Sequence, residues 1–273
     1  MIQVVFVKWG VKYTAESVNR LLRAVRANTR TPVRFVLVTD QVDPEIDPEI
    51  VIKAFPTFAL PFDEVVRGCR AKLSIFAEGI LDPDLPTVYL DLDTVVRGDI
   101  SRLTDNLAKN PGLHMLQNHL VQFWRVRPLL RAIGFRKYYF GNSSILVFLP
   151  RRFHFIFEEF NRITTGTAPP WPRHLRTDER FVSWCARDHV RVISRRLATK
   201  FAEEFMAPVI GLEAFRRQLP WVVRRRRGLV AITFVGPNMK PSALASLERG
   251  AILRRHRLKY RWDPDEFRDY WVQ

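Results

Sequence analysis

Two carboxylates separated by one residue, Asp91 and Asp93, offer the clearest chemistry in the sequence. They lie within the apolar run of residues 87–96, which is typical of a short buried strand. Alternate residues of a strand share a face, so we expect Asp91 and Asp93 to point the same way and Leu92 into the core. Repulsion and burial both disfavour two anions there, and a divalent cation relieves both costs. Hard oxygen ligands suit Mn²⁺ or Mg²⁺.

The same spacing occurs twice more, in Asp82-Pro-Asp84 and Asp263-Pro-Asp265, where proline and other turn residues indicate solvated loops. A structural turn is therefore the alternative to metal binding at Asp91 and Asp93. The apolar strand around this one pair favours the metal site.

The elements before this pair predict where it lies. Residues 4–7 read as a strand, residues 14–27 as a helix with one apolar side, and residues 32–40 as a second strand. Such a β-α-β unit implies a parallel sheet, in which ligands bind beyond the carboxyl ends of the strands. We therefore expect the loop of residues 8–13, Thr39 with Asp40, and the Asp91 pair to converge on one site.

Later segments continue an α/β pattern. We expect irregular connections over residues 41–64, helices over 67–78, 99–107, 153–163 and 178–186, and strands over 190–193 and 229–235. A glycine turn leads into a further strand ending at residue 148. Lys72 falls on the helix of residues 67–78.

Composition limits the class of protein. The 273 residues are 47% hydrophobic, enough for one large α/β domain or two small ones. No apolar run approaches a membrane span, and the first residues enter a strand without a signal-peptide pattern. The only two cysteines, Cys69 and Cys185, are far apart and fit a reducing cytoplasm.

The net charge of +16 favours polyanionic partners: nucleic acid, anionic lipid or phosphate-bearing substrates. Arg224–Arg227 and the basic residues 254–261 are either solvated charge or a docking site for anionic lipid. A nucleic-acid-binding protein is one alternative function, but no helix-turn-helix, RNA-recognition or zinc signature occurs. A sugar nucleotidyltransferase is another, but the loop after the first strand lacks the expected glycine density.

Taken in order, several motifs resemble the GT-A glycosyltransferase family that contains the lipopolysaccharide galactosyltransferases and glycogenin. These motifs are Tyr89-Leu-Asp-Leu-Asp-Thr-Val-Val96, Tyr139-Phe-Gly-Asn-Ser-Ser144, Asp178-Glu179 and Gly236-Pro-Asn-Met-Lys-Pro241. The opening residues 8–13 with Thr39-Asp40 also resemble uncharacterised bacterial members of this superfamily. The resemblance covers roughly residues 1–245.

The resemblance implies a Rossmann-like GT-A fold, with a central, mostly parallel sheet and helices on both faces. It implies one catalytic domain over residues 1–245, with a nucleotide-binding half (1–100) and an acceptor half (101–245). Residues 246–273 would form a basic C-terminal extension. The implied activity is metal-assisted transfer of a hexose, by a retaining course, from a nucleotide-diphosphate sugar such as a UDP-sugar to a glycan or lipid-linked acceptor. The implied location is the cytoplasm, at the inner face of the membrane, and no oligomeric state is implied.

Roles follow for individual residues. Asp91 and Asp93 would bind Mn²⁺ or Mg²⁺, and Asp178 and Asn142 would serve the transfer itself. The residues implied to bind the donor are Lys8, Trp9, Gly10, Lys12, Tyr13, Asp40, Lys72, Asp91, Ser143, Glu179, Gly236 and Lys240. For several of them a plain structural role stays open: Lys72 as a solvated lysine, Asn142 and Ser143 as turn caps, Asp178 as a helix cap, and Lys240 as a surface residue.

The chain departs from the family at three positions. Thr233 or Val235 stands where a third metal ligand, a histidine, is usual, and His119 is a candidate substitute. Ser242 replaces a tryptophan. Glu179 replaces a glutamine, which adds negative charge on the acceptor side.

Overall fold

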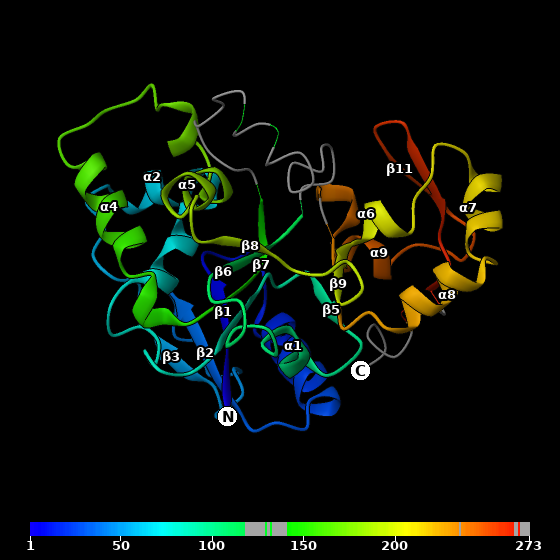
Figure 1. Cartoon of the computed structure of the whole chain (residues 1–273), viewed down its shortest axis with the longest axis horizontal. Coiled ribbons are helices and arrows are strands. Elements are labelled where there is room, and N and C mark those ends of the chain that lie inside the picture. The colour runs from blue at the N-terminus through cyan, green and yellow to red at the C-terminus, as the bar shows by residue number, and fades with distance from the viewer. Residues whose placement is uncertain (118–128, 130–131, 133–140, 235, 265–266, 268–273) are drawn as a thin grey trace.

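A sheet of seven strands forms the centre of the molecule, as the computed structural model in Figure 1 shows. It describes residues 1–117, 129, 132, 141–234, 236–264 and 267. The strand order is β3-β2-β1-β4-β7-β6-β8. The strands are β1 Ile2–Lys8, β2 Val33–Thr39, β3 Val51–Lys53, β4 Thr87–Leu90, β6 Leu113–Leu116, β7 Asn142–Phe148 and β8 Val190–Val192. Only β7 runs antiparallel to its neighbours in this sheet, so the predicted mostly parallel sheet is confirmed.

The first β-α-β unit forms as predicted. Helix α1 (Ala15–Asn28) begins after Thr14, whose hydroxyl accepts a hydrogen bond from the Ser17 amide. Its apolar side, with Val18 and Leu22, is buried. Strands β1 and β2 then pair in parallel, with Val4 opposite Phe35.

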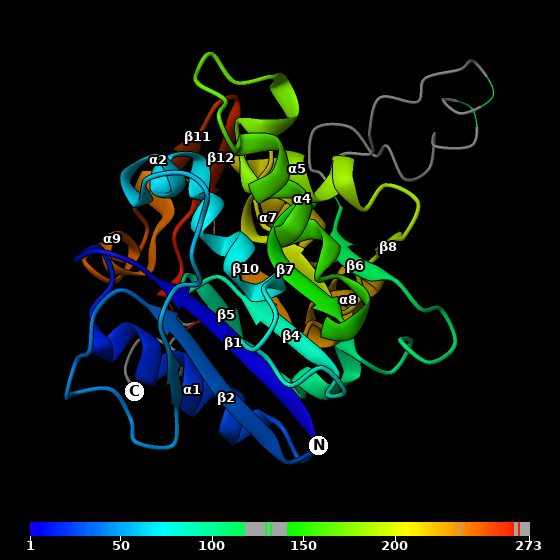
Figure 2. The same cartoon turned by 90° about the vertical axis from the view of Figure 1, so that its left-hand side faces the viewer.

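Helices cover both faces of the sheet because side chains of β1 alternate between two cores. Val4 and Phe6 pack in the core that contains the apolar side of α1. Val5 and Val7 pack in the core on the other face. That second core also contains side chains of the 3₁₀ segment η1 (Arg67–Phe76), α4 (Phe155–Thr164) and α5 (Asp178–Cys185). The predicted fold class, with helices on both faces, is therefore confirmed (Figure 2).

A three-stranded sheet, in the order β5-β10-β9, continues the fold beside the first. Its strands are β5 Thr94–Val96, β9 Ala198–Lys200 and β10 Ala231–Thr233. Around it lie α6 Phe201–Glu204, α7 Ile210–Arg216, α8 Pro220–Arg227, η5 Pro237–Met239, α9 Pro241–Ala245 and the hairpin of β11 Ile252–Arg255 with β12 Leu258–Arg261. These elements gather at the right of Figure 1, away from α4 and α5. The division at residues 100 and 245 stays a prediction.

Several predicted segments differ from the structure, and the helix predicted over residues 99–107 is among them, because only the 3₁₀ segment Ile100–Leu103 forms there. Residues 41–64 are not wholly irregular, because they contain β3 and the start of α2 (Phe62–Val66). Residues 67–76 form 3₁₀ turns, and a kink at Gly68 and Cys69, both with positive φ, interrupts them. The remaining short 3₁₀ segments are η2 Ile100–Leu103, η3 Pro150–Arg152 and η4 Arg173–Leu175.

The prediction of a single strand over residues 87–96 is wrong. It is two strands, β4 and β5, which belong to different sheets. Between them the chain turns: the Asp91 amide donates to the Ser144 carbonyl, and the Thr94 amide donates to the Asp91 carbonyl at 2.9 Å. Asp91 and Asp93 therefore lie in a turn at the carboxyl end of β4, not on a continuous strand. Leu92 is buried, as predicted.

Within the part of the chain that the structure describes, no helix has the length and apolar character needed to cross a bilayer.

Candidate functional site

Each carboxylate of the Asp91–Asp93 turn is paired with a lysine from a distant segment. Lys72 Nζ, on η1, lies 2.6 Å from Asp91 Oδ1, and the Tyr89 hydroxyl donates to the same oxygen at 2.5 Å. Lys240, which precedes α9, donates to Asp93 Oδ2. The pairs bring β4, η1 and the late loop to one point. The structure therefore relieves the repulsion between the two anions with cationic side chains.

With respect to the described residues, one carboxylate oxygen of Asp93 is free to accept a hydrogen bond or to act as a metal ligand. Asp93 Oδ1 is buried, and no residue that the structure describes hydrogen-bonds to it. Thr233, one position considered for a third metal ligand, lies at the end of β10 with its hydroxyl also buried and without a described hydrogen-bond partner. Val235 and His119 lie outside the described residues. Over the described ranges, no group of three His, Cys, Asp or Glu side chains forms a metal site.

Burial and charge shift the titration of this group. Burial raises the pKa of Asp93, and Asp91 adds to the effect while Lys240 opposes it. Burial alone would lower the pKa of Lys72, but Asp91, Tyr89 and Asp178 outweigh it and raise that pKa well above its usual value. The pKa of Lys240 is raised in the same way, because Asp93 and Tyr13 outweigh its burial. Both lysines are therefore held as cations.

Asp178 brings a third carboxylate to the same place. It is the first residue of α5 and is buried, and the Ser143 hydroxyl donates to its Oδ2 at 2.6 Å. Lys72 Nζ lies 3.8 Å from that oxygen, so one ammonium lies close to two carboxylates. Burial raises the pKa of Asp178 to about 6, although Lys72 opposes the shift.

The start of β7 supplies the amide beside this carboxylate. Asn142 Nδ2 donates to Glu179 Oε2 at 2.8 Å, while its Oδ1 accepts from the Ser144 amide. Both polar ends of Asn142 are thus held, and the Asp178-Glu179 pair is tied to β7 by two hydrogen bonds. Tyr139, in the motif that precedes this strand, lies outside the described residues.

Residues of the loop after β1 (residues 8–13) contact two different parts of the structure. The Gly10 amide, at φ +56, donates to both carboxylate oxygens of Asp40, at 3.2 and 3.1 Å. Lys8 Nζ donates to Gln41 at 3.5 Å. These contacts join the ends of β1 and β2, as predicted, but none of them reaches the Asp91 pair.

Tyr13 is the loop residue that approaches the carboxylates. Its pKa is raised to about 12, first by burial and then by Asp93. Lys12 is exposed, and its ammonium lies 5.6 Å from the centre of the Tyr13 ring. Trp9 packs against the core on the α4 face of the sheet.

The late loop needs glycine at its start. Gly236 has φ +94, a region that side-chain-bearing residues rarely adopt, and a Cβ there would meet nothing within 4 Å. The loop leads directly to Lys240, so the positive φ helps the chain return to Asp93.

Sequence reasoning missed two polar residues near these carboxylates. Tyr89 reads as an apolar strand residue, yet its hydroxyl binds Asp91. Lys200 ends β9, is buried, and has its pKa lowered by burial although Glu179 and Glu203 oppose the shift. A lysine embedded in the apolar stretch of residues 197–202 is the signal that was available for Lys200.

The structure thus collects three carboxylates and two lysines at the carboxyl end of β4 from segments far apart in the chain. They are Asp91, Asp93, Asp178, Lys72 and Lys240, with Ser143 and Tyr13 beside them. Such a cluster can balance the charge of a bound anion or cation by rearranging its ion pairs. The Lys8, Gly10 and Asp40 contacts form a separate group at the neighbouring strand ends.

The chain resembles solved glycosyltransferases in its fold. No family model and no curated protein matches the sequence. The galactosyltransferase LgtC, in complex with donor and acceptor sugar analogs, superposes with a TM-score of 0.56 at 16% identity, over 88% of this chain and 89% of that one. The bifunctional glycosyltransferase WbbM, in its apo structure, gives 0.60 at 14% identity, over 88% of this chain and 46% of that one.

The apo form of the glycosyltransferase GlyE of Streptococcus pneumoniae TIGR4 gives 0.59 at 12% identity, over the whole of this chain and 60% of that one. At these identities the likeness concerns the fold. The predicted GT-A fold is confirmed by it.

Proposed function

We propose that this chain, which has the fold of the GT-A glycosyltransferases, transfers a hexose from a nucleotide-diphosphate sugar to a glycan or lipid-linked acceptor. A UDP-sugar is the expected donor. The observation that carries the proposal is the cluster of Asp91, Asp93, Asp178, Lys72 and Lys240 at the carboxyl end of β4. Open α/β sheets bind their ligands at that edge.

The two lysines suit a diphosphate. In the chain without donor, Lys72 and Lys240 neutralise Asp91 and Asp93. A donor diphosphate would offer them a second set of anionic oxygens, so that both ammoniums stabilise the charge that grows on the departing phosphate. The loop of Lys8, Trp9, Gly10, Lys12 and Tyr13, with Asp40, is proposed to hold the nucleotide.

The carboxylates suit Mn²⁺ or Mg²⁺ as a partner of that diphosphate. Asp93 Oδ1 is buried without a described hydrogen-bond partner, and hard oxygens are the ligands that these ions prefer. Asp91 and Asp93 would hold the ion, with phosphate oxygens and water completing its shell. When bound, the ion would supply Lewis-acid stabilisation of the leaving diphosphate.

The transfer itself exchanges one C–O bond for another. The bond from the anomeric carbon to the phosphate oxygen breaks, a bond to an acceptor hydroxyl oxygen forms, and the hydroxyl proton passes to an oxygen of the departing diphosphate. The anomeric carbon gains positive charge in this step, which a nearby carboxylate stabilises. Asp178, steadied by Ser143, and Asn142 are proposed for this place, and Glu179 for the sugar or acceptor hydroxyls.

The expected setting is the cytoplasm, at the inner face of a membrane where lipid-linked acceptors are presented. Nucleic acid is not among the partners that we propose.

A donor panel tests the substrate class. Thermal unfolding is followed with UDP-, GDP-, CMP- and dTDP-sugars, each with and without Mn²⁺. We expect one nucleotide to raise the melting temperature more than the others, and Mn²⁺ to enlarge the rise, because a ligand that binds only the folded state stabilises it. If no nucleotide sugar shifts the transition at millimolar concentration, the proposal is wrong.

A matched pair of variants tests the role of the Asp93 carboxylate in the transfer. Asp93→Asn should reduce donor hydrolysis and transfer by about a hundredfold or more, the range found for lost electrostatic stabilisation. Asp84→Asn alters the same Asp-x-Asp pattern at an exposed position and should leave the rate unchanged. Equal rates in the two variants would count against a role for Asp93.

A further inference from the structure

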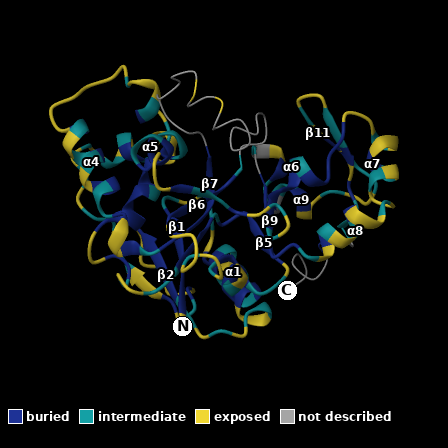
Figure 3. Ribbon diagram, in the orientation of Figure 1, coloured by how far each residue is buried: buried dark blue, intermediate teal, exposed yellow. Residues whose placement is uncertain are grey.

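Two neighbouring helices expose large apolar side chains that the proposed transfer does not use. On α7 and at its start, Val209 is 55% exposed, Leu212 43% and Phe215 60%. On α8, Trp221 is 64% exposed. Both helices lie at the right-hand edge of Figure 3, where exposed residues are yellow. Covering these side chains with a binding partner or a membrane would remove apolar surface from water, so this edge is a candidate docking surface.

The exposure follows from helical spacing. Leu212 and Phe215 are three residues apart and so share one side of α7, Val209 is exposed just before the helix, and Glu213 is buried. On α8, Trp221 and Arg224 lie on the exposed side, whereas Val222 and Arg226 are buried. Helix α7 therefore buries a charged residue and exposes apolar ones, the reverse of an ordinary surface helix, and α8 exposes Trp221 together with arginines.

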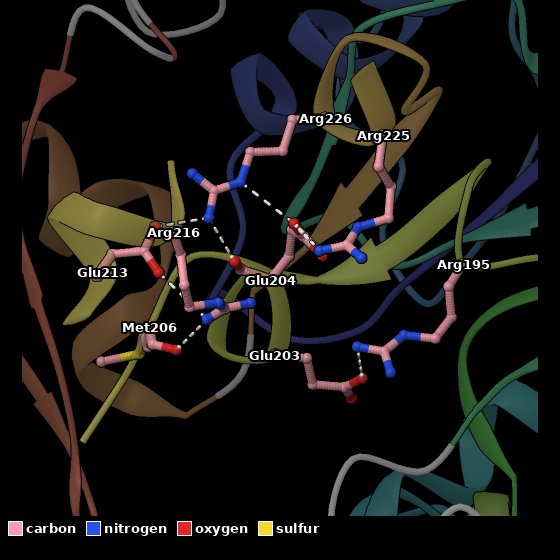
Figure 4. Close-up of polar contacts among 8 residues, drawn as sticks. All are labelled: Arg195, Glu203, Glu204, Met206, Glu213, Arg216, Arg225 and Arg226. Atoms are coloured by element: carbon pink, nitrogen blue, oxygen red, sulfur yellow. Dashed lines mark hydrogen bonds and ion pairs between the residues drawn. The ribbon is translucent and has the colours of Figure 1, made fainter. Parts of the chain in front are cut away.

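A buried ion network holds both helices in this orientation (Figure 4). Arg226 donates through Nε to Glu204 Oε1 at 3.2 Å and through Nη2 to Glu213 Oε1 at 2.5 Å. Arg225 also donates to Glu204, at 2.7 Å, and Arg216 donates to Glu213, at 3.2 Å. These bonds join α6, α7 and α8. Breaking them would leave buried charges unpaired, so the outward side chains belong to a firmly held unit.

The charge exposed beside the apolar side chains is of one sign. Residues 208–228 contain six arginines and one acidic residue, Glu213, which is buried and paired. Three of those arginines are exposed: Arg217, Arg224 and Arg227. The outer surface of this unit therefore presents apolar groups and positive charge, without an exposed carboxylate.

We propose that this basic-apolar face, formed by Val209, Leu212, Phe215, Trp221, Arg217, Arg224 and Arg227, docks on the surface of an anionic lipid bilayer. Aromatic and aliphatic side chains enter the boundary between headgroups and acyl chains, while arginines stay with the lipid phosphates. The aliphatic Val209 and Leu212 favour lipid over nucleic acid, whose phosphates and bases would leave them unused. The exposed arginines would repel one another across a symmetric dimer of this face.

The test is co-sedimentation of the full chain with vesicles. Vesicles of phosphatidylglycerol mixed with phosphatidylcholine are compared with vesicles of phosphatidylcholine alone, at low and high salt. We expect binding to the anionic vesicles that weakens with salt, because the attraction between exposed charges is screened.

Two double variants separate the contributions. Phe215→Ser with Trp221→Ser should reduce partitioning at least about tenfold, since each buried aromatic side chain contributes more than the 1.4 kcal/mol that equals a factor of ten. Arg224→Gln with Arg227→Gln should reduce it by about thirtyfold on anionic vesicles, at about 1 kcal/mol per arginine. It should change nothing on neutral vesicles.

Matched controls lie away from this face. Val42→Ser removes an apolar side chain that is 87% exposed, and Arg30→Gln removes an exposed arginine. Both should partition like the wild type, and donor hydrolysis should be unchanged in all four proteins. The proposal is overturned if the wild type does not prefer anionic vesicles, if the controls lose as much binding as the face variants, or if the face variants abolish nucleic-acid binding or dimerisation and leave vesicle binding intact.

Discussion

At the scale of single residues, the site is a balanced set of charges. Asp91 and Asp93 are each neutralised by a lysine, and Asp178 lies near one of the same lysines. A buried carboxylate without such a partner would be costly, so each lysine supplies the positive charge that a bound cation would otherwise have to supply.

Lys240→Met tests this exchange. Removing the ammonium leaves Asp93, which is almost fully buried, without compensation and should lower the free energy of unfolding by up to about 3–5 kcal/mol in metal-free buffer. Mn²⁺ should then restore stability, and its affinity without donor should rise by about tenfold or more. Calorimetric titration and thermal unfolding measure both effects. Lys109→Met, at an exposed lysine, is the control and should not respond to Mn²⁺.

Asp178 makes the stability of the folded chain depend on pH, and the burial of its carboxyl group determines the sign of that dependence. The pKa rises from 3.8 to about 6 in the folded chain, so the folded state holds the proton more tightly than the unfolded state. Its contribution to stability is fully present below pH 4 and is lost as the pH rises towards 6. The loss amounts to roughly 3 kcal/mol.

Asp178→Asn removes this titration and should remain neutral throughout. Its free energy of unfolding should match that of the wild type near pH 4 and exceed it by up to roughly 3 kcal/mol above pH 6. Urea unfolding across this pH range measures the difference, with EDTA present to exclude metal. A constant difference between the two proteins at all pH values would mean that Asp178 does not titrate in this range.

At the scale of elements, the junction between η1 and α5 positions two site residues at once. Gly68 lies against the backbone of Arg176, just before Asp178, while Lys72 follows four residues later on η1. A Cβ on Gly68 would overlap the carbonyl oxygen of Arg176. The close approach of two backbones therefore sets how near Lys72 comes to Asp178.

Gly68→Ala should separate these backbones. Gly79→Ala is the matched control, because Gly79 also has a positive φ, +78, but open space around its Cβ. The control should cost about 1–2 kcal/mol of stability, the ordinary penalty of alanine in this region. Gly68→Ala should cost at least about 2 kcal/mol more and weaken the thermal shift by donor. Equal losses in urea unfolding would show that the junction tolerates the added carbon.

The helices and strands also show where a local sequence pattern predicts secondary structure correctly. The β-α-β unit was predictable because the apolar residues of α1 follow the helical period and β1 and β2 are short, nearly continuous apolar runs. The edge strand β3 was missed because it has three residues, and Val51 and Ile52 are exposed. The break after Leu90 was missed because residues 87–96 are apolar on both sides of it, and each half joins a different sheet.

At the scale of the whole molecule, side chains from the last described residues pack in one of the two cores. Tyr260 and Trp262 are buried in the cluster that also contains α1. Trp262 packs near Phe201, with ring centres 6.4 Å apart, and lies stacked on Phe267. Several segments far apart in the chain thus share one core, and we expect them to unfold together.

Trp262→Ala should therefore lower the free energy of unfolding by about 3–5 kcal/mol, the usual cost of emptying a large buried site. Trp221→Ala, at an exposed tryptophan, should change it by less than about 0.5 kcal/mol. Urea unfolding followed by circular dichroism measures both. A small loss for Trp262→Ala would mean that the hairpin does not share the main core.

The sequence by itself determined the α/β alternation, the apolar sides of its helices and strands, and the identity of the acidic and basic side chains available for chemistry. These are local properties, set by residue type and by spacing over a few positions. Only the tertiary structure decided that Lys72 meets Asp91, that Lys240 meets Asp93, and that Leu212, Phe215 and Trp221 face outward on α7 and α8. Such contacts join residues that are distant in the chain, and no local period encodes which of many lysines and arginines a buried carboxylate will meet.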